Sequence, residues 1–133
     1  PRTADGETPL FLAVAYGEED SVYHLLGAGA DPNAMTENEE TPLLRAADWE
    51  PEVVAALIAA GADVHYVSST GDTALLGAAR YGQAETVNLL MDAGASAKGI
   101  VTHDDLNLAE AAEQNPDVFG TDAYDRLLED IGE

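Results

Sequence analysis

Short apolar segments alternate along the chain with stretches rich in glycine and acid. Three of these segments carry apolar residues at positions i, i+3 and i+4, a spacing that predicts a helix with one apolar face. Each is followed by a glycine, which is suited to end a helix. The apolar positions are Val22, Leu25 and Leu26, then Val54, Leu57 and Ile58, then Val87, Leu90 and Met91, and the glycines are Gly29, Gly61 and Gly94.

A shorter apolar segment precedes each of these helices and begins with threonine. Thr suits the N-cap of a helix, and the Pro that follows it in two copies suits the first helical position. We expect short helices that end near Gly17 or Gly82 with a left-handed stop, and alanines inside them that let neighbours approach closely. The starts are Thr8-Pro9-Leu10, Thr41-Pro42-Leu43 and Thr73-Ala74-Leu75, and the alanines are Ala13, Ala46, Ala78 and Ala109.

Both kinds of segment recur with one period. The threonine starts are 33 and 32 residues apart, and the Gly-Ala phrases at 29, 61 and 94 follow at steps of 32 and 33. The middle unit is one residue shorter than the first, and the residue is missing from the loop before its second helix. Pro51 is suited to the first turn of that helix. A weaker fourth copy contains Leu106, Leu108 and Ala109. Two motifs that share a period predict helix pairs stacked side by side.

These phrases resemble the ankyrin repeat family, whose unit reads roughly D-G-x-T-P-L-H-L-A-A-x-x-G-x-x-x-x-V-x-x-L-L-x-x-G-A-D-x-N. Residues 5–13 and 29–33 match it closely, and the resemblance spans about residues 4–113. It implies an all-α solenoid of stacked antiparallel helix pairs with hairpin-like loops, and protein binding through these fingers and the inner-helix face. We expect a single domain over residues 1–133, with repeats at about 4–35, 36–67 and 68–99 and a capping repeat at 100–133.

The chain departs from the family unit at two kinds of position. The histidine of the motif is replaced by apolar residues, which predicts apolar packing between repeats in place of a hydrogen bond. The Asp and Asn that close the unit also change, so we expect the third and fourth fingers to be less regular. The histidine phase carries Phe11, Leu44 and Leu76, the Asp phase ends in Ser96, and the Asn phase ends in His65 and Lys98.

A charged residue and a glycine stand where the motif has a leucine. The phase of Leu12 carries Arg45 in the second unit and Gly77 in the third. We expect the stem of Arg45 to pack over Gly77 and its guanidinium to reach a nearby acid.

The two ends of the stack are expected to carry polar outer faces, because terminal repeats lack one neighbour. At the N-terminal end, the acidic residues at 18–20 make the second helix a polar cap by itself, or a further repeat precedes it. At the C-terminal end, Thr121 is suited to cap a helix with an apolar stripe and an outward polar face. The stripe comprises Tyr124, Leu127, Leu128 and Ile131, and the polar face Asp125, Arg126, Glu129 and Asp130.

The chain is strongly acidic, with 26 acids, 5 bases and a net charge of −21. This charge repels nucleic-acid phosphate, and no apolar run is long enough to span a membrane. It favours a basic protein partner, or it serves solubility or a salt-rich environment. The absence of cysteine fits a reducing compartment such as the cytoplasm without requiring one. The sequence begins at Pro1 rather than Met, so we expect a processed or trimmed end, and a monomer when no partner is bound.

Enzymatic chemistry finds little support in the sequence. His24, His65 and His103 lie in different repeats and phases, and a general base needs a partner within about 3 Å. The run His103-Asp104-Asp105 lacks a metal-binding spacing, and helix capping by Asp104 is the better interpretation. No glycine-rich phosphate loop is present. We therefore expect no enzyme activity, no cofactor and no metal.

One aromatic residue per unit follows each threonine by eight positions, at Tyr16, Trp49 and Tyr81. In a stack these side chains form a ladder beside an acidic edge, and such a surface suits Arg or Lys of a partner. The other interpretation is that each aromatic covers the neighbouring inner helix. The candidate partner-binding residues are Tyr16, Trp49 and Tyr81, with Asp48 and Arg80 beside them, and Asp5, Glu7, Glu37, Asn38, Glu40, Ser69, Thr70 and Asp72 at the finger side.

These features predict a non-enzymatic module that binds a basic protein on its concave face. A narrower hypothesis is an inhibitor or immunity protein that covers the cationic site of a nuclease or other toxin. Two alternatives remain open: a salt-adapted scaffold whose acids serve solubility, favoured by the single Lys, and a regulatory fragment of a larger protein.

Overall fold

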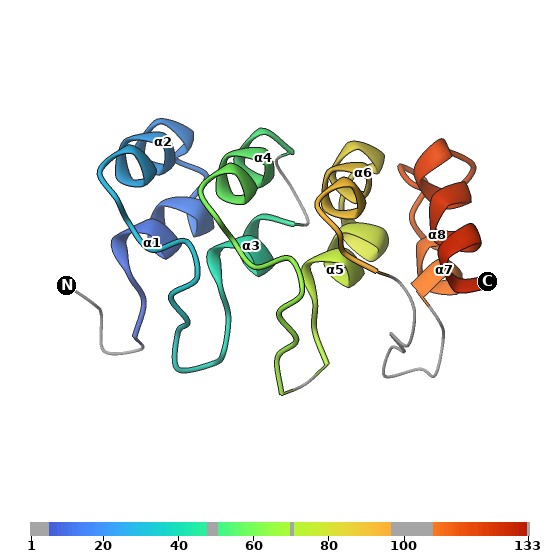
Figure 1. The fold of residues 1–133 in the computed structure, drawn as a ribbon, viewed down its shortest axis with the longest axis horizontal. Coiled ribbons are helices and arrows are strands. Elements are labelled where there is room, and N and C mark those ends of the chain that lie inside the picture. Colours follow the sequence, from blue (N-terminus) through green and yellow to red (C-terminus); the bar gives the residue numbers. More distant parts are fainter. Residues whose placement is uncertain (1–5, 48–50, 70, 97–107, 133) are drawn as a thin grey trace.

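The structure is a computed structural model that describes residues 6–47, 51–69, 71–96 and 108–132. In these ranges the chain forms eight helices and no strand, which confirms the all-α prediction (Figure 1). The helices are α1 (Pro9–Ala15), α2 (Glu19–Gly27), α3 (Pro42–Ala46), α4 (Pro51–Ala59), α5 (Ala74–Tyr81), α6 (Ala84–Asp92), α7 (Leu108–Ala112) and α8 (Asp122–Gly132).

The helices stack in two rows. In the inner row α1, α3, α5 and α7 contact one another in that order, and in the outer row α2, α4, α6 and α8 do the same. Each inner helix also packs on the outer helix that follows it in the chain. Long loops descend from the helices and turn back as fingers (Figure 1). The predicted stack of helix pairs is therefore confirmed.

Threonine fixes the start of each of the first three inner helices. The hydroxyl oxygens of Thr8, Thr41 and Thr73 accept hydrogen bonds from the backbone N–H three residues later, at 3.1, 3.2 and 3.0 Å. Each bond satisfies one of the donors that a helix N-terminus leaves without a partner. Pro9 and Pro42 follow at the first helical position, where a missing N–H costs nothing.

The two glycines expected to stop inner helices differ in the structure. Gly17 has a φ of 72°, the predicted left-handed conformation. Gly82 has a φ of −95°, so the expectation of a left-handed stop is wrong there. A Cβ at Gly82 would lie 2.5 Å from the carbonyl oxygen of Ala47, which shows that close approach of the neighbouring repeat requires this glycine.

The core runs along the stack between the two rows. The predicted apolar stripes of the outer helices supply Val22, Val54, Leu57, Val87 and Leu90, all fully buried. Full burial of one such side chain stabilises the fold by about 1.5–3 kcal/mol. The inner helices add Leu10, Leu43 and Leu75, with Ala46 and Ala78 wholly buried beside them.

A polar side chain joins the loops of the first two repeats. Asn33 donates to the carbonyl of Gly61 at 3.0 Å and accepts from the N–H of Asp63 at 2.7 Å. In the next loop His65 occupies the same phase, and its ring lies 3.7 Å from where a Cβ on Gly94 would stand. The replacement of Asn by His therefore exchanges two hydrogen bonds for a packing contact.

The C-terminal helix α8 covers the last outer helix. Its apolar face includes Leu127, which is fully buried, whereas Leu128 is exposed, contrary to the predicted stripe. Arg126 was expected on the outward face, but its guanidinium donates to Asp92 and Asn88 of α6 at 2.9 Å each. Ser96 donates to Asp130 of this helix at 2.9 Å. Polar contacts thus fasten the cap to the third repeat.

Buried Asn115 makes a second connection to the third repeat. Its side-chain amide donates to the carbonyls of Ala79 and Gly82, at 3.1 and 2.8 Å, and its side-chain oxygen accepts from the N–H of Asp117 at 3.0 Å. The two carbonyls lie at the end of α5, and the N–H of Asp117 lies in the turn between α7 and α8. The cap is therefore held by a fully bonded polar side chain as well as by apolar packing.

Candidate functional site

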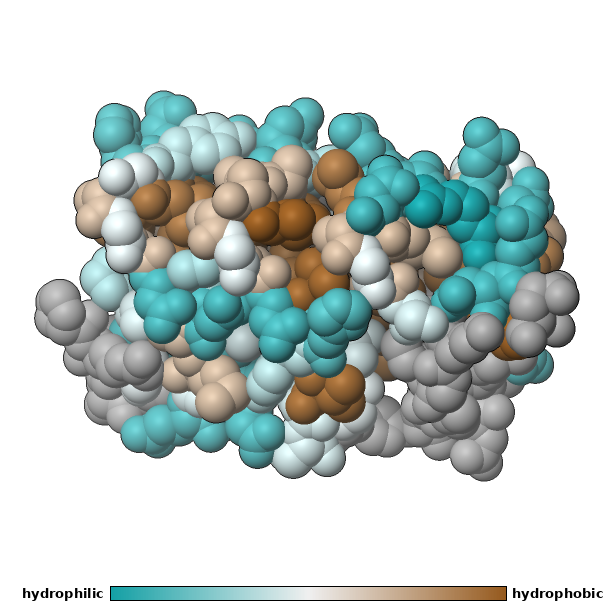
Figure 2. Space-filling view, in the orientation of Figure 1, coloured by the Kyte–Doolittle hydropathy of each residue, from teal (hydrophilic) through white to brown (hydrophobic). Residues whose placement is uncertain are grey.

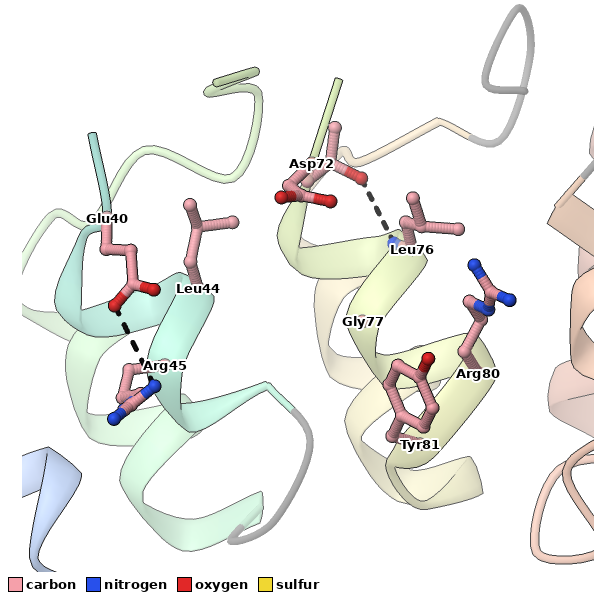
Figure 3. A pocket seen from close by; sticks show the side chains of 9 residues that line it. Glu40, Leu44, Arg45, Asp72, Leu76, Gly77, Arg80 and Tyr81 are labelled. Atoms are coloured by element: carbon pink, nitrogen blue, oxygen red, sulfur yellow. Dashed lines mark hydrogen bonds and ion pairs between the residues drawn. The ribbon is translucent and has the colours of Figure 1, made fainter. Parts of the chain in front are cut away.

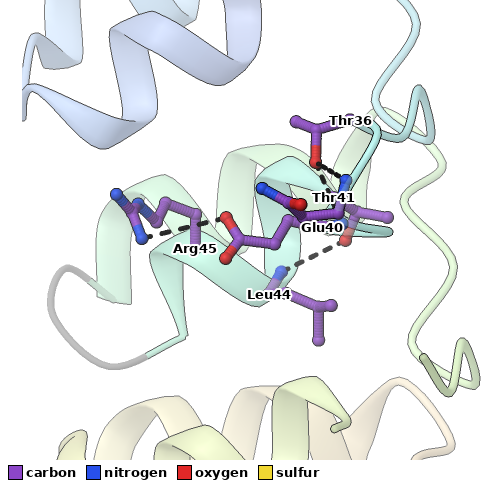
Figure 4. A network of polar contacts seen from close by, with 6 residues as sticks. Thr36, Glu40, Thr41, Leu44 and Arg45 are labelled. Atoms are coloured by element: carbon purple, nitrogen blue, oxygen red, sulfur yellow. Dashed lines mark hydrogen bonds and ion pairs between the residues drawn. The ribbon is translucent and has the colours of Figure 1, made fainter. Parts of the chain in front are cut away.

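The fingers before α3 and α5 close with the same backbone turn. Thr36 donates its N–H to the carbonyl of Glu40, and Ser68 donates to Asp72 in the same way, at 2.9 and 3.0 Å. The Thr36 hydroxyl also accepts from the N–H groups of Asn38 and Glu40 (Figure 4). This turn places Glu40 and Asp72 just before the threonine caps, at the point where each finger meets its inner helix.

The predicted acids and polar residues of the finger side lie at or near the surface. Glu37, Asn38, Ser69 and Asp72 are exposed, and Glu7 and Glu40 are half-buried. The Glu37 side chain lies against the preceding finger, where a Cβ on Gly6 would stand 3.2 Å from its Cγ. Four predicted residues lie outside the described part of the chain: Asp5, Asp48, Trp49 and Thr70.

Two predicted aromatic residues stand at the far end of the inner helices. Tyr16 is the C-cap of α1 and is 75% exposed, and Tyr81 is the last residue of α5 and is 67% exposed. They share one phase of the repeat, and α3 lies between their helices. A residue that served mainly to cover its neighbour would be more buried than this, so both rings are accessible to a partner.

A groove of about 330 Å³ opens between α3 and α5 and contains four of the predicted residues (Figure 3). On one wall, Asp72 lies at the finger, before α5, and Leu76, Gly77, Arg80 and Tyr81 follow along α5. The facing wall from α3 and its finger has Glu40, Leu44 and Arg45. The groove is thus acidic at the finger, apolar above it, and lined by arginine and tyrosine further along.

Arg45 lies in this groove in a different place from the one expected. Its guanidinium is 3.8 Å from a Glu40 oxygen, so the predicted acid partner exists (Figure 4). The guanidinium carbon also lies 5.8 Å from the ring centre of Phe11, in the preceding repeat. A Cβ at Gly77 would meet Ala47 within 4 Å but not Arg45. Packing of the Arg45 stem over Gly77 is therefore wrong, because cation–π attraction draws the side chain toward Phe11.

Arg80 lies beside the aromatic residue that follows it. Its guanidinium carbon is 5.6 Å from the ring centre of Tyr81. Such a contact is worth about 0.5–1 kcal/mol at an exposed site and orders both side chains. The surface formed by the predicted partner-binding residues therefore already contains a cation over one of its aromatic rings.

Glu39 is a finger residue that the sequence analysis did not select. Its φ is 64°, where the corresponding Gly6 and Gly71 have 78° and 85°. The Glu39 carboxylate accepts from the N–H of Ser69 at 2.9 Å, and its carbonyl accepts from the Tyr66 hydroxyl at 2.9 Å. The sequence feature that could have identified Glu39 is a glutamate at the glycine position of the motif. In the structure, Glu39 joins adjacent fingers through these two hydrogen bonds.

Two tyrosines outside the groove have a raised pKa. Burial and the nearby Glu39 carboxylate raise the pKa of Tyr66. The hydrogen bond from the Tyr124 hydroxyl to Glu113, at 2.8 Å, raises the pKa of Tyr124, with burial adding to it. Both hydroxyls therefore stay protonated and act as hydrogen-bond donors.

The described residues add no candidate for a catalytic or metal-binding site. His24 and His65 are exposed in different repeats, and the run at 103–105 lies outside the description. Within the described residues no three His, Cys, Asp or Glu side chains gather as metal ligands.

The visible face of the molecule is polar along its outer edge. Figure 2 shows hydrophilic residues over the tops of the outer helices and hydrophobic ones between and below them. Acids occupy the first turns of these helices, at Glu19, Asp20, Glu52 and Glu85. Each of the described helices is too short or too polar to cross a bilayer.

Comparison with known proteins identifies the repeat. The family model described as "Ankyrin repeats (3 copies)" matches residues 10–100, which is more than half of the chain. A search of curated proteins gives no match. The matched range includes α2 to α6 and all of α1 except Pro9. The chain therefore belongs to the ankyrin repeat family.

Proposed function

We propose that this protein is a non-enzymatic module that binds a basic protein on the surface formed by its fingers and inner helices. Ankyrin repeats are protein–protein interaction modules, which gives the general part of the proposal. The observation that carries the specific part is the pair of accessible rings, Tyr16 and Tyr81, together with the acids Glu40 and Asp72, which line the same groove as Tyr81. Arginine and lysine are the side chains that pair with both kinds of group.

The net charge supports a basic partner. A charge of −21 on a chain of 133 residues attracts cationic proteins and raises their association rate at low salt. Two of the acids form ion pairs with arginine, Glu40 with Arg45 and Asp92 with Arg126. Because the chain has 26 acids and 5 bases, its own basic side chains can neutralise only a small part of the negative charge.

Some of the acidic residues also stabilise the helices in which they lie. Glu19, Asp20, Glu52 and Glu85 sit in the first turns of outer helices, where the helix dipole stabilises a negative side chain by about 0.3–1 kcal/mol. These acids favour the second interpretation, in which charge serves solubility or adaptation to salt. The finger acids Glu40 and Asp72 precede the N-cap threonines and line the groove, so recognition remains the better account of them.

An inhibitor or immunity role is the narrower form of this proposal. A cationic enzyme site that binds nucleic acid would accept the acidic fingers in place of phosphate. The role predicts inhibition that weakens steeply with salt, because screening reduces attraction between exposed charges.

The experiment is capture of a basic partner from the native source at low salt, followed by binding measurements with the purified partner. Replacement of Tyr16, Trp49 and Tyr81 by Ala is expected to weaken binding by at least about tenfold, since aromatic residues dominate interface energetics. Tyr23→Ala is the matched control, because Tyr23 is an exposed tyrosine on the outer helix α2. Equal binding by the triple variant and the wild type would contradict the proposal.

Unfolding in salt separates recognition from adaptation. A salt-adapted scaffold is expected to have a much larger free energy of unfolding in molar salt, because salt screens the repulsion among its own acidic residues. A recognition surface predicts a stable fold at ordinary ionic strength and a partner affinity that falls as salt rises.

A further inference from the structure

An apolar strip is exposed at the C-terminal end of the stack, on α8 and the turn before it (Figure 1). Phe119 is 52% exposed and Leu128 is 44% exposed. The Phe119 ring meets the ring of Tyr124 edge to face, with the ring centres 5.1 Å apart. Leu128 follows Tyr124 by four residues, so these two side chains are neighbours on one face of the helix. Phe119, Tyr124 and Leu128 therefore form one continuous apolar surface, which we call the end strip.

Comparison with the other outer helices shows that the end strip corresponds to a packing face. Tyr124 and Leu128 have the spacing of the first and last positions of the apolar stripes in α2, α4 and α6, and each of these helices packs on the next outer helix. There the first position is fully buried and the last is partly buried against the core, whereas Tyr124 is only half-buried and Leu128 is exposed. The equivalents of Tyr124 are Val22, Val54 and Val87, and those of Leu128 are Leu26, Ile58 and Met91.

Acidic side chains flank both edges of the end strip. Asp125 and Glu129 are four residues apart, each one position after a residue of the strip, so they lie together along one edge of it on α8. At the other edge the Tyr124 hydroxyl donates to Glu113, in the turn after α7, at 2.8 Å. All three acids are exposed. The end strip is thus apolar along its centre and negative at its margins.

We propose that the end strip binds an amphipathic helix of a protein partner, one whose apolar face lies between rows of Lys or Arg. A helix fits, because each of the other outer helices packs against a helix at the next position in the stack. The 11 residues of α8 are about 16 Å long, which accommodates about three turns of a partner helix. Basic margins on that helix complement the acidic margins of the strip. A second copy of this chain is disfavoured, because it brings the same acids and a net charge of −21.

The end strip is a second docking surface, and the inference goes beyond the proposed function without depending on it. The strip lies on α8 and the turn before it, whereas the groove with Tyr81 and the finger acids lies between α3 and α5. A partner can therefore occupy either surface alone.

The test uses three synthetic peptides of about four helical turns each. The first has Leu along one face of the helix and Lys on both sides of that face. The second has Glu in place of every Lys, and the third contains the residues of the first in an order that leaves no apolar face. Affinity is measured by calorimetry at moderate salt, and the site of contact by NMR of the Phe119, Tyr124 and Leu128 side chains. Saturable binding with shifts at these three residues is expected for the first peptide, and affinity at least about tenfold lower for the other two.

Variants of the apolar residues test the centre of the strip. Phe119→Ser and Leu128→Ser are each expected to weaken binding of the first peptide about tenfold, because each removes an apolar contact from the interface. Both side chains are about half exposed, so the fold is expected to persist, and urea denaturation checks this. Tyr23→Ser is the matched control, since Tyr23 is 41% exposed on the outer helix α2, and the affinity is expected to stay unchanged.

Variants of the acids test the margins. The double variant Asp125→Asn with Glu129→Gln is expected to lower the affinity for the first peptide about tenfold, because it removes the charges that face the Lys rows. The matched control is Asp20→Asn with Glu19→Gln, which removes the same charge from α2. A change of less than about twofold is expected for this control.

Four results would overturn the assignment. The first is equal affinity for all three peptides, and the second is the absence of saturable binding. The third is a set of NMR shifts that leaves out Phe119 and Leu128. The fourth is self-association of the chain, in place of peptide binding, that Leu128→Ser abolishes, because it would assign the end strip to a second copy. None of these results bears on the finger surface, which the tyrosine variants test separately.

Discussion

The carbonyl oxygen of Ala47 lies 2.5 Å from the position that a Cβ on Gly82 would occupy. A side chain there forces the second and third repeats apart, and overpacking of this kind costs about 1–3 kcal/mol. We predict that Gly82→Ala lowers the free energy of unfolding by about that amount, measured by urea denaturation.

Gly77 is the matched control for this prediction. It lies in the same helix, α5, where a Cβ would make only an ordinary contact with Ala47. We expect Gly77→Ala to stabilise the fold by about 0.5–1 kcal/mol, because Gly is a poor helix residue. A Gly82→Ala protein as stable as Gly77→Ala would contradict the close approach.

Asn115 is predicted to be the main polar link between the C-terminal cap and the third repeat. Asn115→Ala leaves the carbonyls of Ala79 and Gly82 without their side-chain donor, so a loss of about 2–3 kcal/mol is expected. Hydrogen exchange should show faster opening of α8 than of α4. Gln114→Ala, at an exposed neighbouring position, serves as the control and is expected to change stability by less than about 0.5 kcal/mol. Uniform exchange in both variants would show that the cap does not open separately.

Glu39 combines a backbone cost with a side-chain gain. A non-glycine residue with a φ of 64° costs about 1 kcal/mol, and the bond from Ser69 offsets it. We predict that Glu39→Gln is less stable than the wild type, because it keeps the backbone cost and weakens the bond. Glu39→Gly removes both terms and is expected to be at least as stable as Glu39→Gln in urea titrations. The reverse order would mean that the backbone conformation carries no cost.

Stability at high pH should depend on Tyr66 and Tyr124. Both have a folded pKa raised above the ordinary value of 10.0, so folding favours their protonated forms. Their contribution is fully present below about pH 10 and is lost as pH rises through the raised values. We predict that the Tyr66→Phe, Tyr124→Phe double variant loses less stability than the wild type over this range. Identical pH dependence of unfolding in the two proteins would contradict the raised pKa values of Tyr66 and Tyr124.

The period of the sequence was enough to predict the helix pairs, their order and the threonine caps. Repetition amplifies local signals, because a cap or stripe that recurs in phase is unlikely to be accidental. Positions that depend on the neighbouring repeat were harder. Gly82 was predicted to be a left-handed helix stop, but in the structure it allows the close approach of Ala47. The Arg45 side chain was predicted to pack over Gly77, but it lies over the Phe11 ring. These outcomes depend on distances between helices, which the sequence does not contain.

The central claim is that the finger acids act by position and not only by charge. The most direct measurement compares affinity for the purified basic partner between two double variants of equal net charge, Glu40→Gln with Asp72→Asn and Glu52→Gln with Glu85→Gln. The first pair lies at the groove and the second on outer helices. We predict at least about a tenfold loss of affinity for the groove pair and less than about twofold for the outer pair at moderate salt. Equal losses would show that the partner responds to net charge alone, and the proposed docking surface would be wrong.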